Sequence, residues 1–227
     1  MPEQTLFLDF ETHYDAASGY DLKSMPTHQY VRDERFQTLG CSVWMPGQDR
    51  PQWLDGYEAV RDYFDAVDWN TTSAVAHNAG FDGTVLWERY GHAPAFWYDT
   101  QAMARYAVSQ GWLDPGQSVR LGDLAPIVGR EKGDTGAAVA AGGEALAEYA
   151  LEDLYIMAAL WRLWAPHTPA DELAYMDIHV RMATEPVLEL DRGRLAGVAA
   201  QEPPELAKRL RKDAEFTKAL RHYGIEP

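Results

Sequence analysis

The sequence predicts an α/β fold, in which a sheet is covered by helices and followed by a C-terminal helical extension. Up to Pro166, short β-prone runs alternate with segments of helical spacing, which is typical of such folds. Apolar residues make up 46% of the 227 positions, enough to build a buried core. After Pro166 and Pro169 the alternation ends and the pattern becomes mainly helical. We therefore expect one domain at residues 1–166 and the extension at 167–227.

The expected strands are short apolar runs bounded by turn residues. Residues 5–10 (TLFLDF) form a β-prone run that ends in acidic residues, and they predict a buried strand. Residues 36–45 predict a second strand, and the turn MPGQDRP leads into a third at 52–54. Further short strands are expected at 73–76 and 96–98.

The expected helices are segments whose apolar residues recur at helical spacing. The longest is residues 144–164, and the Gly/Ala-rich segment 129–143 before it predicts a loop. In the extension we expect an extended segment at 187–191 and a basic helix at 205–223. The other predicted helices cover residues 57–67, 80–90, 100–108, 121–128 and 171–184.

The net charge of −15, from 20 Lys and Arg against 35 Asp and Glu, is unfavourable for a protein that binds polyanions. The charge is uneven, however, because residues 192–222 carry eight basic and four acidic side chains. Bound divalent metal would also absorb part of the acidity. The charge alone therefore does not decide the function.

Cys41 is the single cysteine, so no disulfide can form within the chain, which fits a reducing cytoplasm. The N-terminal sequence lacks a basic segment followed by a long apolar run, so no signal peptide is expected. No uncharged apolar stretch is long enough for a membrane span. We expect a cytoplasmic protein, of a bacterium or of a phage-infected cell, with no membrane partner.

Asp9 and Glu11 form the first candidate site. Residues two apart in a strand project from the same face, so these carboxylates lie together while Leu8 and Phe10 face the other way. Adjacent carboxylates repel unless a cation lies between them, and Mg²⁺ or Mn²⁺ prefers oxygen ligands. A solvated strand end explains this short motif equally well.

The second candidate is the segment HNAGFD, which places Asp82 at the start of a helix beside the sheet. Asn78 is equally explained as a helix cap, since Asn is favoured there. His77 is expected to be a packed or capping residue rather than a catalyst, and is kept only as a possible substrate contact.

The third candidate is Tyr149 with Asp153. Residues four apart on a helix are neighbours, so the phenol and the carboxylate share one face. Beside a metal, Asp153 can be a ligand while Tyr149 orients the attacking water. Alone, the pair is better explained as part of an ordinary amphipathic helix.

Together, the ordered motifs LDFET, HNAGFD and YALED resemble the DEDD superfamily of 3′→5′ exonucleases, in its tyrosine-bearing branch. The resemblance implies a ribonuclease H-like mixed sheet flanked by helices, and a two-metal-ion hydrolase that uses Mg²⁺ or Mn²⁺ to release nucleoside 5′-monophosphates. It assigns Asp9, Glu11, Asp82 and Asp153 as metal ligands and Tyr149 as the residue that positions water.

The resemblance also implies contacts with the terminal nucleotide. Thr12, His77, Asn78 and Phe81 are the expected residues, with Phe81 stacking or packing beneath the nucleotide. A purely structural position in the core explains Phe81 equally well.

Over residues 5–165 the sequence is similar to the proofreading domain of phage-type family A DNA polymerases. The segments YDTQAMAR and LGDLAPIVGREK look like later landmarks of that domain, including Asp99, Thr100 and Lys132. The extension is similar to the segment that joins exonuclease and polymerase in those proteins. The resemblance implies single-stranded DNA with a 3′ end as substrate and a polymerase body or subunit as partner.

Two other functions stay open. An RNA-directed exonuclease of the same superfamily would have identical catalytic residues and would differ in contacts to the 2′-hydroxyl. A non-catalytic module that binds single strands or a polymerase would use the basic segment 192–222 for docking, although a solvated helix explains that segment as well.

Overall fold

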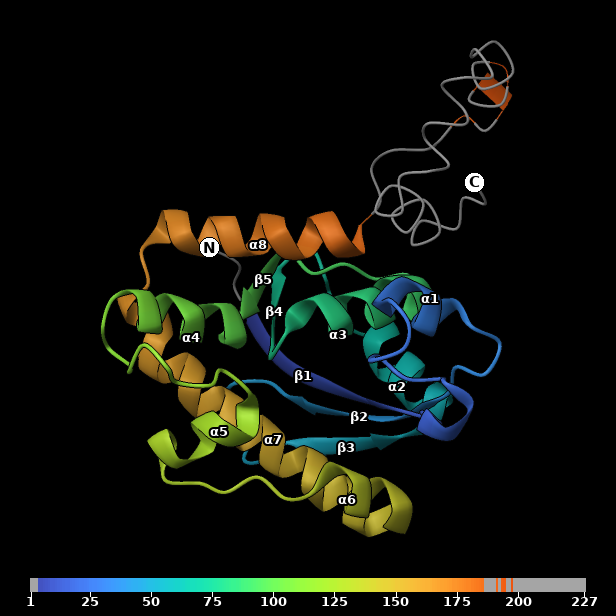
Figure 1. Cartoon of the computed structure of the whole chain (residues 1–227), viewed down its shortest axis with the longest axis horizontal. Helices are drawn as coiled ribbons and strands as arrows, with labels where there is room; N and C mark the ends of the chain where they lie inside the picture. Colours follow the sequence, from blue (N-terminus) through green and yellow to red (C-terminus); the bar gives the residue numbers. More distant parts are fainter. Residues whose placement is uncertain (1–3, 186–190, 192, 195–196, 198–227) are drawn as a thin grey trace, which may run out of the picture. The chain divides into compact units, whose positions relative to one another are not determined.

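The structure is a computed structural model that describes residues 4–185 together with 191, 193, 194 and 197. Within these residues, a five-stranded sheet has the order β3-β2-β1-β4-β5 (Figure 1). The strands are β1 (Gln4–Thr12), β2 (Thr38–Trp44), β3 (Gln52–Asp55), β4 (Thr72–Ala76) and β5 (Phe96–Asp99). The strands β1, β2 and β3 pair antiparallel, whereas β4 pairs parallel to both β1 and β5. The predicted mixed sheet is thereby confirmed.

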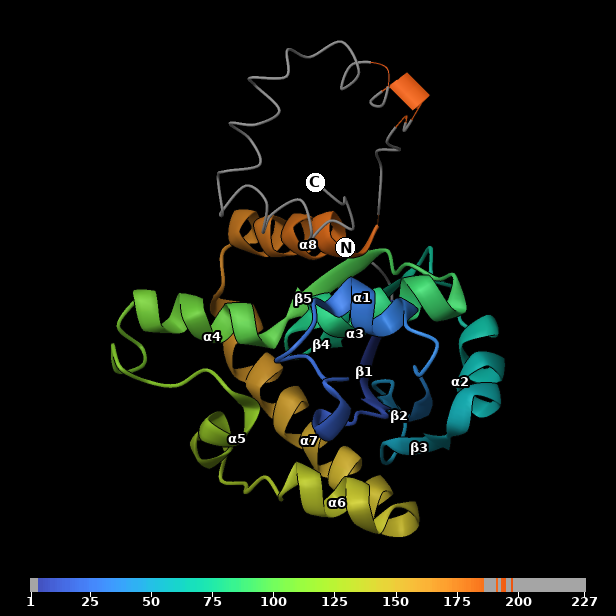
Figure 2. The same cartoon turned by 45° about the vertical axis from the view of Figure 1, so that its right-hand side comes forward.

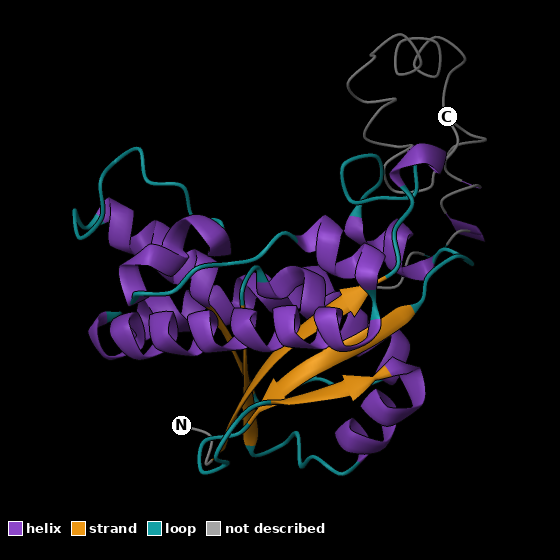
Figure 3. Cartoon of the chain, turned by 90° about the horizontal axis from the view of Figure 1, so that it is seen from below, coloured by secondary structure: helices purple, strands orange, loops and turns teal. Residues whose placement is uncertain are grey.

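Helices cover both faces of the sheet (Figure 3). The α-helices are α1 (Thr27–Arg32), α2 (Gly56–Asp65), α3 (Ala79–Val85), α4 (Thr100–Ser109), α5 (Leu121–Leu124), α6 (Thr135–Ala141), α7 (Gly143–Trp164) and α8 (Ala170–Thr184). Short 3₁₀ segments are η1 (Ala16–Ser18), η3 (Ala125–Val128) and η4 (Ala165–His167), and η2 (Leu86–Tyr90) is a π-helix that continues α3.

The alternation of β1 separates two hydrophobic cores. Leu6, Leu8 and Phe10 pack with residues of α2 and α3 on one face. Phe7 packs with residues of α4, α5 and α7 on the other. Figure 2 shows α2 and α7 on opposite sides of the sheet. Asp9 has the same parity as Phe7, so it faces the α7 side, as the spacing predicted.

Two short helices were not predicted from the sequence. Helix α1 lies in the segment between the first two strands, and α6 occupies part of the segment expected to be a loop. The α6 helix begins where the Asp134 side chain accepts a hydrogen bond from the backbone N–H of Ala137 at 2.6 Å. Its Ala138 is buried against α7 residues that include Leu146 and Tyr149. Capping and packing therefore stabilise a Gly/Ala-rich sequence that has a weak helical pattern.

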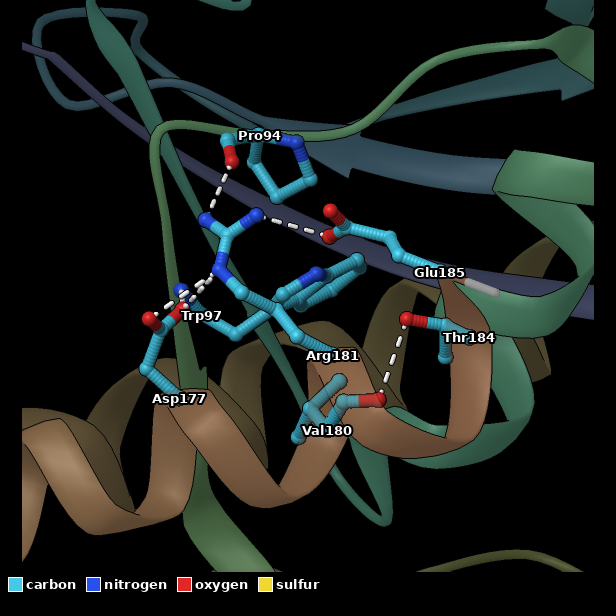
Figure 4. A network of polar contacts seen from close by, with 7 residues as sticks. All are labelled: Pro94, Trp97, Asp177, Val180, Arg181, Thr184 and Glu185. Carbon is cyan, nitrogen blue, oxygen red and sulfur yellow. Dashed lines mark hydrogen bonds and ion pairs between the residues drawn. The ribbon is translucent and has the colours of Figure 1, made fainter. Parts of the chain in front are cut away.

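Helix α8 packs against β5 and α3, and a polar network joins it to β5 and to the segment just before that strand (Figure 4). Asp177 accepts a hydrogen bond from the backbone N–H of Trp97 at 2.8 Å, and it pairs with Arg181 at 3.0 Å. The same guanidinium donates to the carbonyl of Pro94 at 2.7 Å and pairs with Glu185 at 2.7 Å. These contacts fasten the helix to the edge strand of the sheet.

The chain divides into two compact units, Met1–Glu185 and Pro186–Pro227. Helix α8, which the sequence analysis placed in the extension, thus belongs with the sheet. The predicted extended segment at 187–191, except for residue 191, and the predicted basic helix at 205–223 lie outside the described residues. Whether residues 167–227 correspond to the segment that joins exonuclease and polymerase stays a prediction. Among the described helices, none combines the length and apolarity that a membrane crossing requires.

Candidate active site

Strand β1 brings two of the predicted acids together at its carboxyl end. Asp9 and Glu11 project toward α7, which packs across β1 and β2. Each of Asp9, Glu11 and Asp153 offers a carboxylate oxygen, and these three oxygens all lie within 4.8 Å of one another. Two of the three elements that carry the predicted motifs therefore converge on one point.

Asp153 lies on the buried face of α7, with only 2% of its surface exposed. One of its oxygens, Oδ2, forms an ion pair with the Lys132 ammonium. Within the described part of the chain, no hydrogen-bond donor reaches the other oxygen, Oδ1, although it is buried. A buried carboxylate oxygen without a partner is costly, and a cation is the partner that would satisfy it.

Asp82 lies in the first turn of α3, beside the strand that carries the other acids. It is 2% exposed and accepts a hydrogen bond at 3.0 Å from the backbone N–H of Phe10, the residue between Asp9 and Glu11. Burial and the nearby Asp9 charge raise the pKa of Asp82 above its ordinary value. The fourth predicted acid thus lies against the same stretch of β1, outside the group of three.

The cluster is electrostatically strained in the absence of metal. Burial, followed by repulsion from Asp153, raises the pKa of Asp9 to about 7. Burial, followed by repulsion from Asp9 and Asp153, raises the pKa of Glu11 to about 8. Burial also raises the pKa of Asp153, while the Lys132 ammonium opposes that shift. A single lysine thus leaves the excess negative charge only partly compensated.

Tyr149 lies one turn before Asp153 on α7, and its hydroxyl is held in place. The phenol oxygen is 2.6 Å from the Thr135 hydroxyl, and the Lys132 ammonium lies 4.6 Å from the centre of the ring. Burial, followed by the Asp153 charge, raises the pKa of Tyr149 to about 12, so the phenol stays protonated at neutral pH. It can therefore act as a hydrogen-bond donor but not as a base.

These residues fit divalent cations. The donor set consists of carboxylate oxygens, which Mg²⁺ and Mn²⁺ prefer. The oxygens of Asp9, Glu11 and Asp153 are close enough to share an ion, and Asp153 Oδ1 needs a partner. A divalent ion would also remove the repulsion that raises the carboxyl pKa values.

The four predicted substrate contacts do not all lie in one cavity. Thr12 and Phe81 line a cavity of about 560 Å³ that Glu11 borders. His77 lines another cavity, of about 720 Å³. Both ring nitrogens of His77 are engaged, at 2.9 Å from the Thr100 hydroxyl and 3.0 Å from the Val119 carbonyl. Burial lowers the pKa of His77 to about 4, so the ring is neutral at pH 7.

Asn78 occupies the cap position of α3 but does not cap it with its side chain. Its φ of 68° is left-handed, a conformation that Asn tolerates better than most residues, and its backbone N–H donates to Asp99 at 3.1 Å. The exposed side chain is thus free of the capping role that the sequence suggested. Substrate contacts of Thr12, His77, Asn78 and Phe81 remain predictions.

Sequence reasoning missed several residues of these cavities. Tyr14, Leu22, Lys23 and Tyr30 line the 560 Å³ cavity, and Thr135 lines both cavities. They come from the segment after β1 and from the start of α6, where no motif marks them. No local sequence signal could have found them, because only the fold brings these segments to the cavities.

Fold and acids together define a class: a ribonuclease H-like α/β domain with a carboxylate cluster suited to divalent metal at its sheet. Among solved structures, the chain is similar to NrnC of Brucella melitensis with bound Mg²⁺. The TM-score is 0.56 and the sequence identity 14%, with 88% of this chain and 89% of that one covered.

A second structure, Brucella melitensis NrnC bound to pGG, gives a TM-score of 0.55 and 16% identity, covering 80% and 83% of the two chains. A third structure, of Brucella melitensis NrnC alone, gives a TM-score of 0.53 and 15% identity, and the match covers 88% of this chain and 89% of that one. At these identities the likeness establishes a shared fold. Neither protein-family models nor curated protein sequences match the chain. None of the three structures is described as a polymerase domain, so the phage-polymerase branch stays a prediction.

Proposed function

We propose that the chain is a metal-dependent 3′→5′ exonuclease that hydrolyses the terminal phosphodiester of a nucleic-acid strand. The observation that carries the proposal is the convergence of Asp9, Glu11 and Asp153 within 4.8 Å, with Asp82 bonded to the backbone between the first two. Buried acids at such proximity are costly to a fold, so they are typical of functional sites.

Each acid has a proposed role. Asp9, Glu11 and Asp153 would hold a divalent ion on the side of the attacking water, and Asp82, with Asp9, would help to hold a second. Divalent ions bound there supply activation of water and stabilisation of the leaving 3′-oxygen. Tyr149 aims the water through its protonated hydroxyl, which Thr135 orients at 2.6 Å.

The two cavities beside the acids support a nucleic-acid substrate. The 560 Å³ cavity has apolar and aromatic walls, including Tyr14, Leu22 and Phe81, which suit a nucleoside. The 720 Å³ cavity carries Arg120 and Lys132, which suit phosphate, beside the acidic Asp123 and Asp134. Both cavities are lined by Thr135, so a strand could place its end in one and its backbone in the other.

The preferred substrate in this proposal is DNA with a single-stranded 3′ end, in keeping with the resemblance to proofreading domains. A polymerase body or subunit is the corresponding partner. RNA is the second candidate, favoured by one observation: a structure of the same fold, NrnC, binds pGG, a short nucleic acid. Both candidates use the same acids and differ only in the sugar.

Digestion of end-labelled oligonucleotides tests the proposal. Matched DNA and RNA strands, labelled at the 5′ or the 3′ end, are incubated with Mg²⁺, Mn²⁺ or EDTA. We expect stepwise shortening from the 3′ end that requires metal, with DNA degraded faster than RNA. Faster RNA degradation would select the second candidate.

Asp9→Ala provides the matched control, because it removes a metal ligand and relieves repulsion without removing core packing. Metal-dependent degradation that persists in this variant would refute the site. Tight strand binding without cleavage by the wild type would instead favour a non-catalytic binding module.

A further inference from the structure

The pairing of β1 with β2 shifts register just where the candidate ligands end. Glu11 lies opposite Gly40, but Thr12 lies opposite Thr38, so Leu39 is an extra residue on β2. Such a bulge bends the strand that carries it, here β2. On β1 the alternation continues, so Thr12 lies on the same face as Phe10, and both border the 560 Å³ cavity together with Glu11.

A chain of hydroxyl groups starts at Thr12. Its Oγ1 lies 2.8 Å from the Tyr30 hydroxyl, which lies 2.6 Å from the carbonyl oxygen of His13. A carbonyl can only accept, so the single Tyr30 proton points to His13. The Thr12 hydroxyl must then donate its own proton to Tyr30. Its oxygen has only lone pairs left, and it can accept a hydrogen bond but cannot donate one.

Tyr30 is held firmly enough to maintain this direction. Its side chain is almost completely buried and stacks on Tyr20, with ring centres 4.7 Å apart. Phe36 packs edge-on against the same ring at 5.9 Å. The Tyr20 hydroxyl donates to the backbone carbonyl of Tyr30 at 3.2 Å, which fastens α1 to the segment after β1.

We propose that Tyr30 is a positioning residue that fixes the Thr12 hydroxyl as an acceptor, and that the site thereby selects strands ending in a free 3′-hydroxyl. This inference rests on the proposed function. A terminal nucleoside in the cavity beside Glu11 brings its sugar to Thr12, and in DNA the 3′-hydroxyl is the only O–H that this sugar carries. A strand ending in 3′-deoxyribose lacks the donor, and a 3′-phosphate adds negative charge beside the acids.

The test compares hydrolysis of two oligonucleotides that differ only in a terminal 3′-hydroxyl or 3′-hydrogen. The quantity measured is the ratio of the two kcat/KM values. We expect the wild type to favour the 3′-hydroxyl end by about tenfold, the range of one buried hydrogen bond. Tyr30→Phe removes the acceptor for the Thr12 proton, so the hydroxyl can rotate and the ratio should fall to about 1–3. Thr12→Val should have the same effect on the ratio.

Tyr20→Phe is the matched control. It deletes one hydroxyl from the same stacked pair and breaks a hydrogen bond to Tyr30, but it keeps the Thr12–Tyr30 and Tyr30–His13 hydrogen bonds. We expect its ratio to equal that of the wild type even if its overall rate is lower. If Tyr30→Phe kept the wild-type ratio, or if Tyr20→Phe lost it to the same degree, the positioning role would be wrong.

The outcomes also separate this inference from the proposed function. If the wild type hydrolyses neither strand with Mg²⁺ or Mn²⁺, the exonuclease proposal itself fails. If it hydrolyses both strands at equal rates, the exonuclease proposal stands and the selection of 3′-hydroxyl ends is refuted.

Discussion

Neutralising Asp9 should stabilise the metal-free protein, which is the opposite of what most core substitutions do. Burial and the neighbouring carboxylates raise the pKa of Asp9 to about 7 in the folded chain, against an ordinary value of 3.8. Because the folded pKa is raised, the fold is favoured when this carboxyl is protonated. That contribution is fully present below about pH 4 and is lost as the pH rises through about 7.

The size of this destabilisation follows from the linkage between proton binding and folding. At about 1.4 kcal/mol for each pKa unit, the shift sets an upper limit of about 4 kcal/mol at pH 8. Asp9 is partly exposed, and Lys132 compensates some of the charge, so we expect Asp9→Asn to add about 1–3 kcal/mol to the free energy of unfolding. At pH 5 the gain should fall to less than about half of its value at pH 8.

Urea unfolding of wild type and Asp9→Asn in EDTA, at pH 8 and pH 5, measures this difference. Asp177→Asn serves as the control, because that carboxylate is paired with Arg181 and bonded to the N–H of Trp97, so its neutralisation should destabilise. In Mg²⁺ the wild type should be more stable than Asp9→Asn, since only the wild type keeps all four acids for the ion. An Asp9→Asn variant that is less stable than wild type in EDTA at pH 8 would refute the electrostatic reasoning.

Three further predictions concern turnover and packing. Tyr149→Phe should lower kcat in the oligonucleotide assay less severely than Asp9→Ala, because it deletes one hydrogen bond and no metal ligand; equal loss would contradict the water-orienting role. Thr135→Ala should lower kcat by a smaller factor than Tyr149→Phe, since the phenol is retained and only the Thr135 hydroxyl, 2.6 Å from the phenol oxygen, is lost. An unchanged kcat would show that this contact does not orient the phenol. Gly40→Ala should cost about 1–3 kcal/mol in urea unfolding, because a Cβ there would overlap the ring of Trp53 and lie 2.6 Å from the carbonyl oxygen of Leu54. Unchanged stability would show that the ring and the strand both adjust without cost.

The order of the elements and the pairing of the acids on β1 could be predicted from local patterns. Alternation along Asp9, Phe10 and Glu11 placed the two carboxylates on one face, because strand side chains alternate regardless of the rest of the fold. The same reasoning placed Tyr149 and Asp153 on one face of α7. These predictions depend only on the geometry of a single element.

The parts that could not be predicted depend on contacts between distant segments. The bulge at Leu39, opposite the end of β1, arises from the pairing of β1 with β2, and nothing within LDFET indicates it. The hydroxyl chain needs α1 to bring Tyr30 to Thr12, and the short α1 was itself missed. Lys132 was noted only as a landmark of a resemblance, whereas its ion pair with Asp153 depends on how the segment before α6 folds over α7.

Anomalous X-ray diffraction from crystals grown with Mn²⁺ tests the central claim most directly. We expect a peak bounded by Asp9, Glu11 and Asp153, with a second beside Asp82 when a strand end is bound, and the loss of both in Asp9→Ala. Manganese bound elsewhere, with these four carboxylates unoccupied at saturating metal, would contradict it.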